Sequence, residues 1–502
     1  MAITPTYAAY DYTARGAQIR SQSIVECRLS DWAQNRPLAV CPRVTLTGAE
    51  VRDGEVRYSG KLYFSVVART EDGAVISAER GAEFSHRAEC ADAAPACRAE
   101  VRLTVEKTET RQDGRALILS AIVTAEIGLL VPSQLHYLSG GEGVVCDFRA
   151  ARLCRLYSCA GQAEFEEEFD TDYVGDVLAH SEQIGLTRVV AGTGALDVSG
   201  EVCLCVLAKR AGESEVVSYE RLIPFRAEIP CDEAAAGMAC RASAEISSVE
   251  LSATCDEEKG RCRILAQIAV SVSGCVFGGE KVLLPADAFC PGAACALRRD
   301  SVRFEEPTCA FTAVERVSGT AALGGTVDFS CALQAAAQCT VEAAASVSEG
   351  EIAVEGVLHT VVFYREGEEE RSLPVSLPFA FPVRSDRARA GDRAEMTAIV
   401  CGVSVRQKTE GELEAEGTLR LFFTLFGGER TDCVTELTAG EPVPESGAAI
   451  RVFMPAAGDT LWETAKKLGK PPEQVAEENP ELAFPLRGDE RIVVYRRREL
   501  GA

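Results

Sequence analysis

The feature that most constrains the fold of this chain is a threefold internal repeat with a period of about 150 residues. Three segments alternate apolar and polar side chains with period two, which is typical of a strand with one buried face. A glycine occupies the same phase of each pattern, and a glycine inside a strand pattern indicates a bulge or a close approach of another segment. The segments are 56–67, 196–207 and 352–363, with glycines Gly60, Gly200 and Gly356.

Two further anchors follow each strand glycine in the same order. The first is a phenylalanine 24 or 25 residues later: Phe84, Phe225 and Phe381, the last with Phe379 beside it. The second is a glycine in a predicted hairpin turn, 54, 60 or 55 residues after the strand glycine: Gly114, Gly260 and Gly411. Glycine supplies the positive φ that tight hairpins need. Three ordered anchors in three copies indicate a true repeat.

The repeat predicts a mainly β fold with three tandem modules, each a β-sandwich or partly open barrel. A length of 502 residues agrees with about three domains. The stretch 438–449 contains Pro, Gly and acidic residues without periodicity, so it is predicted to be a linker. The predicted division is 1–150, 151–300 and 301–437 for the β modules, 438–449 for the linker and 450–496 for a small α+β module.

After the linker the pattern changes from strand to helix. Thr460 and Glu463 form the T-x-x-E pattern of a capping box, in which each side chain binds the other residue's backbone N–H. A helix is predicted to follow and to end at Gly469, and Pro471–Pro472 is predicted to start a second helix. With a short apolar run from Ile450 and a final strand at 491–495, the predicted order is β-α-α-β.

Charge and hydropathy exclude several classes of protein. The chain has 52 Lys and Arg against 76 Asp and Glu, and residues 451–502 are balanced, so the net charge of −24 lies in the first 450 residues. Such an acidic surface repels phosphate backbones and disfavours nucleic-acid binding. No apolar run is long enough for a transmembrane helix, and the N-terminus does not resemble a signal peptide. We therefore expect a cytoplasmic protein with no membrane span.

The 21 cysteines are expected to be reduced thiols, as is usual in the cytosol. There is no C-x-x-C, and the four His residues are scattered, so no metal site is predicted. Cys203 and Cys205 lie on one face of a predicted strand, which alternation alone explains. Cys90/Cys97 and Cys255/Cys262 share a spacing of seven residues.

Catalytic signatures are not found. The patterns G-x-S-x-G and H-E-x-x-H and a P-loop are missing from the sequence. The acidic residues between Glu164 and Asp170 could be paired carboxylates, but such a run is more often a solvated surface. We expect no enzyme, no catalytic residue and no cofactor.

The C-terminal module resembles a LysM domain at 458–462, 465–466, 479–480, 488–489 and 492–494. The resemblance implies a shallow groove for N-acetylglucosamine polymers, between the first strand–helix loop and the second helix–strand loop. An alternative is that Asp459 and Thr460 only cap a helix while Leu461 and Trp462 pack. The residues that the resemblance assigns to binding are Gly458, Asp459, Thr460, Leu461, Asn479, Pro480, Leu482 and Pro485.

Three β repeats followed by one LysM-like module resemble the SPOCS-domain family of endospore-forming bacteria, in particular its SipL-type spore morphogenetic proteins. The resemblance implies a scaffold in the mother-cell cytoplasm, at the surface of the engulfed forespore. The implied partner is the coat morphogenetic ATPase that forms the coat basement layer, or another coat protein, bound partly through the LysM module.

Two other functions remain open at this point. The chain could be a cell-wall protein that binds peptidoglycan through the LysM groove, or a hydrolase that LysM targets, although no spacing of carboxylates supports the hydrolase. Exposed sheet edges can pair between chains, so self-association is a further expectation.

Overall fold

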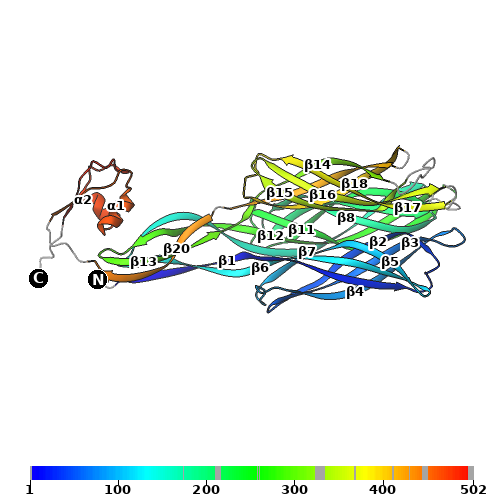
Figure 1. The fold of residues 1–502 in the computed structure, drawn as a ribbon, viewed down its shortest axis with the longest axis horizontal. Helices are drawn as coiled ribbons and strands as arrows, with labels where there is room; N and C mark the ends of the chain where they lie inside the picture. The colour runs from blue at the N-terminus through cyan, green and yellow to red at the C-terminus, as the bar shows by residue number, and fades with distance from the viewer. Residues whose placement is uncertain are drawn as a thin grey trace.

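The computed structural model describes residues 3–172, 175–209, 216–256, 258, 260–322, 334–366, 369–409, 412–428, 430–443 and 450–495. In this part the chain is mainly β, and its strands form antiparallel sheets of two or three strands. Figure 1 shows a long molecule with a broad part at one end, a narrow part at the other, and two short helices beside the narrow end.

The three repeats are visible in the order of the strands. The first repeat contains β1 (Thr4–Leu29), β2 (Arg36–Arg52), β3 (Glu55–Arg69), β4 (Val75–Glu89), β5 (Arg98–Asp113) and β6 (Ala116–Glu142). The second contains β7 (Val145–Asp172), β8 (Asp176–Ala191), β9 (Ala195–Lys209), β10 (Val216–Pro230), β11 (Ala239–Asp256) and β12 (Arg261–Phe289). The third contains β13 (Ala293–Arg303), β14 (Glu306–Ala322), β15 (Gln334–Ser348), β16 (Glu351–Glu366), β17 (Glu369–Arg384), β18 (Arg393–Thr409), β19 (Glu412–Gly427) and β20 (Arg430–Pro442).

Each repeat builds two three-stranded sheets with the same topology. The second, third and fourth strands form a meander, β2-β3-β4 in the first repeat, and the first and fifth strands both pair with the last, as β1-β6-β5. In the third repeat the two long strands are interrupted, so β14-β19-β18 forms the sheet and β13-β20 a separate ribbon. Apolar residues from both sheets share one core cluster in the second and third repeats, as expected for two layers that pack face to face.

The strand glycines lie where another side chain leaves no room for a Cβ atom. A Cβ on Gly60, Gly200 or Gly356 would approach the ring of the phenylalanine opposite it to 2.6, 2.4 or 2.7 Å. The phenylalanines are Phe84, Phe225 and Phe379. The close approach predicted from the sequence is therefore present, but the third equivalent is Phe379 and not Phe381, because Phe379 is in register with the glycine.

The predicted turn glycines are found in two of the three repeats. Gly114 and Gly260 have φ of +61° and +59°, the left-handed conformation that favours glycine. Gly411 lies outside the described residues.

The three repeats follow one another in sequence but lie side by side in space. Val67, Leu207 and Phe363 each come seven residues after their strand glycine, are almost fully buried, and belong to one cluster. Strand contacts follow a cyclic order, with β4 against β8, β10 against β15, and β17 against β2. The tandem modules are therefore not separate bodies. They form a closed ring around a shared core, because part of each meander face is apolar and packs on its neighbours.

A charged cluster lies between the repeats at another set of equivalent positions. Glu100, Arg241 and Glu395 are each the third residue of their strand. Arg241 pairs with Glu100 at 2.5 Å and with Glu395 at 3.5 Å, and only 13% of its side chain is exposed. Arg15 and Arg393 also pair with Glu395. Burial opposes ionisation of Glu395, but the arginines outweigh it and lower its pKa.

The narrow part of the molecule, here called the stalk, is made from the ends of the long strands. It consists of 4–13, 132–142, 145–155 and 278–289 together with β13 and β20, and the rest of the three repeats is called the head (Figure 1). The stalk has an apolar core with residues from all three repeats. Its buried residues include Tyr10, Leu135, Leu138, Leu153, Leu284, Cys433 and Val434.

The expected boundaries can be compared with the ends of the strands. Residues 150 and 300 lie within β7 and β13, and the turns between repeats are at 143–144 and 290–292. The first part of the predicted linker, 438–442, belongs to β20, because it pairs with β13 in the stalk despite its Gly and Pro. Residues 444–449 lie outside the described residues.

One pair of cysteines is oxidised, contrary to the expectation of reduced thiols. Cys255 and Cys262 form a disulfide near the end of the β11–β12 hairpin. The two residues are directly opposite each other in the antiparallel pair, with Cα atoms 4.0 Å apart. Cys90 and Cys97 have the same sequence spacing but flank a turn and remain thiols.

The C-terminal module has the predicted element order. It contains β21 (Ile450–Phe453), α1 (Leu461–Leu468), α2 (Pro472–Glu478) and β22 (Ile492–Tyr495), and β21 pairs with β22. The capping box at Thr460 and Glu463 and the C-cap at Gly469 are both present. In the part of the chain that is described, neither helix is long and apolar enough to cross a membrane.

Candidate functional site

The two loops of the C-terminal module that the sequence assigns to binding lie against each other. The Gly458 N–H donates to the Leu486 carbonyl at 2.7 Å, and the Leu486 N–H donates to the Asp459 carbonyl at 2.9 Å. Gly458 has a φ of +91°, which favours glycine at this turn. These backbone bonds join the loop before α1 to the loop before β22, so the structure brings together the two halves of the predicted site.

The residues of the first loop differ in how far burial and hydrogen bonds within the module occupy their side chains. Asp459 is buried and accepts hydrogen bonds from Lys467 Nζ at 2.7 Å and from the Ala456 N–H. The Lys467 ammonium, and then the Ala456 N–H, lower the pKa of Asp459. Thr460 caps α1 through the Glu463 N–H. Thr460 is exposed, whereas Leu461 is half-buried in the module core. Thr460 is the N-cap of α1, but Asp459 is not, because its carboxylate binds the Ala456 N–H before the helix and the Lys467 ammonium.

Residues of the second loop divide in the same way. Asn479 donates to the carbonyls of Val475 and Val493 and accepts from the Val493 N–H, which ties the end of α2 to β22. Leu482 is half-buried in the module core. Pro480 and Pro485 are exposed. Gly458, Thr460, Pro480 and Pro485 are thus the predicted residues that are most open to a ligand.

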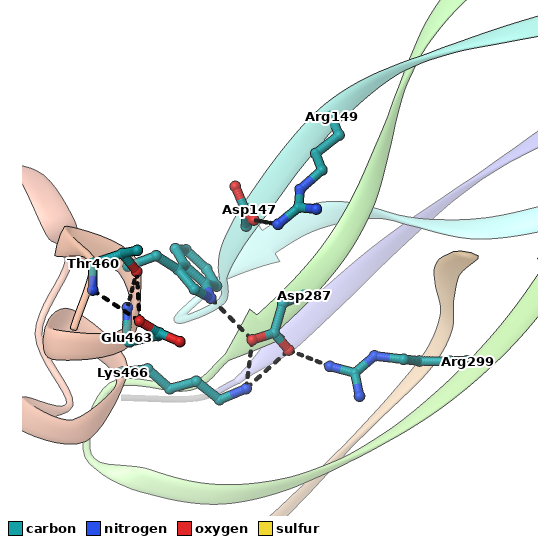
Figure 2. Close-up of polar contacts among 8 residues, drawn as sticks. Asp147, Arg149, Asp287, Arg299, Thr460, Glu463 and Lys466 are labelled. Carbon is teal, nitrogen blue, oxygen red and sulfur yellow. Dashed lines mark hydrogen bonds and ion pairs between the residues drawn. The ribbon is translucent and has the colours of Figure 1, made fainter. Parts of the chain in front are cut away.

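A second contact, which the sequence did not predict, joins the module to the stalk. Asp287 on β12 accepts hydrogen bonds from Trp462 Nε1 at 2.9 Å and from Lys466 Nζ at 2.6 Å (Figure 2). Arg299 on β13 pairs with the same carboxylate, and the Phe289 and Trp462 rings meet edge to face at 5.3 Å. These four interactions are here called the Asp287 contact.

The electrostatics of the Asp287 contact favour the ionised carboxylate. Burial opposes ionisation, but hydrogen bonds from Lys466 and Trp462 outweigh burial and lower the pKa of Asp287. On the strand opposite, Asp147 pairs with Arg149 instead, as Figure 2 also shows. No sequence signal could link Asp287 to Trp462, because 175 residues separate them and Asp287 belongs to no recognisable motif.

The chemistry available at this site is non-covalent binding. The exposed loop residues offer backbone groups, a hydroxyl and proline rings. Among the described residues, no group of three or more His, Cys, Asp or Glu side chains is placed to hold a metal ion.

Comparison of the chain with models of protein families, with curated proteins and with solved structures finds no match.

Proposed function

We propose that this chain is a non-catalytic adaptor in endospore coat assembly, which binds a protein of the coat basement layer partly through the loops of its C-terminal module. One observation carries the proposal: the two loops that the LysM resemblance assigns to binding lie together, and four of the eight assigned residues are exposed. The resemblance to SPOCS-domain proteins supplies the class of partner and the site of action, the forespore surface in the mother-cell cytoplasm.

The shape of the molecule agrees with an adaptor. A long β body with the C-terminal helices beside its narrow end separates the module from the head (Figure 1). The excess negative charge lies in the first 450 residues, and residues 451–502 are balanced, so the two ends would attract different partners.

The test is a pull-down from extracts of sporulating cells with the full chain and two variants. Ala483→Arg places a long charged side chain in the exposed second loop, and Glu477→Arg places the same side chain on the exposed surface of α2. We expect the parent chain and Glu477→Arg to recover a coat protein and Ala483→Arg to lose it. Recovery of no coat protein by the parent chain, or equal recovery by both variants, would contradict the proposal.

The same loops support a second candidate function, peptidoglycan binding. Sedimentation of the parent chain with purified peptidoglycan distinguishes the two. Retention that Ala483→Arg abolishes and Glu477→Arg preserves would favour the glycan over the coat protein as the ligand.

A further inference from the structure

The Asp287 contact consists of few, partly exposed interactions, as expected for a contact that can form and break. On the module side it uses side chains of the outer face of α1, Trp462 and Lys466, and 40% of the Lys466 side chain is exposed to solvent. The bonds are charge-assisted and specific, but they are few compared with the apolar cores between the repeats. The apolar part of the contact is also small, with Phe289, Val145 and Cys295 from the stalk. A small contact between two folded parts favours relative motion.

The module keeps its own core whether or not it is docked. Ala465, Leu468, Val475, Ile492 and Val494 are buried together between the two helices and the small sheet. The stalk adds Phe289, which is almost fully buried in the same cluster, and the partly buried Val145 and Cys295. Detachment would therefore expose Phe289 and Trp462 but would not unfold the module.

The carboxylate also has a partner in both arrangements. Arg299 is on the stalk and pairs with Asp287 independently of the module. When Lys466 and Trp462 leave, Asp287 remains paired with Arg299, and the Lys466 ammonium becomes fully hydrated. No buried charge is left without a partner, which removes the main cost of separating an ion pair.

We propose that the C-terminal module is a movable element that docks on the stalk through the Asp287 contact and detaches from it without unfolding. Trp462 is the second residue of α1, directly after the first binding loop, so docking fixes the direction in which the binding loops face. Detachment frees that direction. This inference goes beyond the proposed function and holds for any ligand of the loops.

The experiment uses tryptophan fluorescence of the full chain. Trp32 and Trp462 are the two tryptophans, so Trp32→Phe leaves Trp462 as the single reporter. In that background we compare Asp287→Asn with Asp147→Asn, its neighbour on the facing strand. Loss of the charge-assisted bonds is expected to lower the ratio of docked to detached module about ten- to a hundredfold. Asp287→Asn should then show red-shifted emission and stronger quenching by acrylamide, and Asp147→Asn should match the parent.

A second variant and a second measurement separate detachment from misfolding. Lys466→Met removes one donor from the module side and should shift the emission in the same direction. The denaturation midpoint of the head, followed by circular dichroism, should stay unchanged in all three variants. The inference is wrong if Asp287→Asn leaves the emission of Trp462 unchanged, or if Asp147→Asn shifts it equally.

Discussion

The contacts that hold the three repeats of the head together differ in kind from the contact that holds the C-terminal module on the stalk. Between the repeats of the head, equivalent residues such as Val67, Leu207 and Phe363 are fully buried, and a buried fully apolar side chain contributes about 1.5–3 kcal/mol. The module meets the stalk at the Asp287 carboxylate and at a small apolar patch around Phe289. The first kind of contact makes three repeats one folding unit, and the second leaves the module a unit of its own.

Charge is used differently in the two regions as well. In the head, Arg241 is largely buried between Glu100 and Glu395 of other repeats, so removing it takes a partner from both glutamates, although Arg15 and Arg393 still pair with Glu395. At the stalk, Asp287 has donors on both sides and one of them remains if the other leaves. The largely buried Arg241 therefore fixes the arrangement of the repeats. The Asp287 carboxylate, which has donors on both the stalk and the module, permits the module to move.

The strongest test of this difference is Arg241→Glu. The substitution brings three carboxylates together between the repeats, and we expect the free energy of unfolding of the head to fall by about 3–5 kcal/mol. Chemical denaturation measures the change. Arg226→Glu is the control, because Arg226 forms an exposed pair with Asp197 and should cost at most about 1 kcal/mol. Equal effects would contradict the role of the cluster, and the double variant Glu100→Arg, Arg241→Glu should recover part of the loss.

The second test is Gly200→Ala, which acts within one repeat. The new methyl group would lie 2.4 Å from the Phe225 ring and 2.5 Å from the Gly185 carbonyl, so strands must shift. We expect a loss of about 1–3 kcal/mol in the free energy of unfolding. At Gly192 the nearest atom is 3.6 Å away, and Gly192→Ala should be close to neutral in the same denaturation experiment. A neutral Gly200→Ala would show that the close approach has no structural role.

A smaller effect is expected from Thr460→Ala in the module. The variant loses the N-cap of α1, which should cost about 1 kcal/mol of the stability of the module and leave the head unchanged. In the Trp32→Phe background, Trp462 emission during denaturation reports the module, and circular dichroism reports the head. Thr460→Ser keeps the hydroxyl and should behave as the parent. A parallel loss in the head would mean that the module is not a separate unit.

The smallest expected effect is that of pH on docking. The pKa of Asp287 is lowered from its ordinary value of 3.8, so ionised Asp287 stabilises the docked arrangement above that value and loses this effect as the pH falls through its lowered pKa. Trp462 emission should be constant from pH 7 to about 5 and shift only below about 4. Asp287→Asn should remove the shift, and a shift near neutral pH would point to another group.

The sequence predicts the parts of this fold that depend on local pattern. Alternation and the strand glycines identify the repeated strands, and the Thr460–Glu463 box locates the start of α1. The packing of the repeats against one another was not predictable. Residues that face a neighbouring repeat, such as Leu207, are as apolar as residues that face the core of their own repeat. The choice between Phe379 and Phe381 depends on register, which sequence spacing leaves uncertain by two residues.

The sequence could predict a contact of the candidate site only where both contacting segments belong to the same motif. The two loops lie within 30 residues of one another and share a resemblance, so they could be named together. Asp287 is a single acid on a long strand, and nothing in its neighbourhood distinguishes it from Asp147. Only the folded stalk places it under α1.

The contact of β17 with β2 joins the last repeat to the first. Loss of one repeat by recombination would expose apolar surfaces of the two remaining repeats to water. A fourth repeat would not fit, because the ring of three is closed. The copy number of such a protein is therefore expected to stay at three while loops, charges and the terminal module diverge.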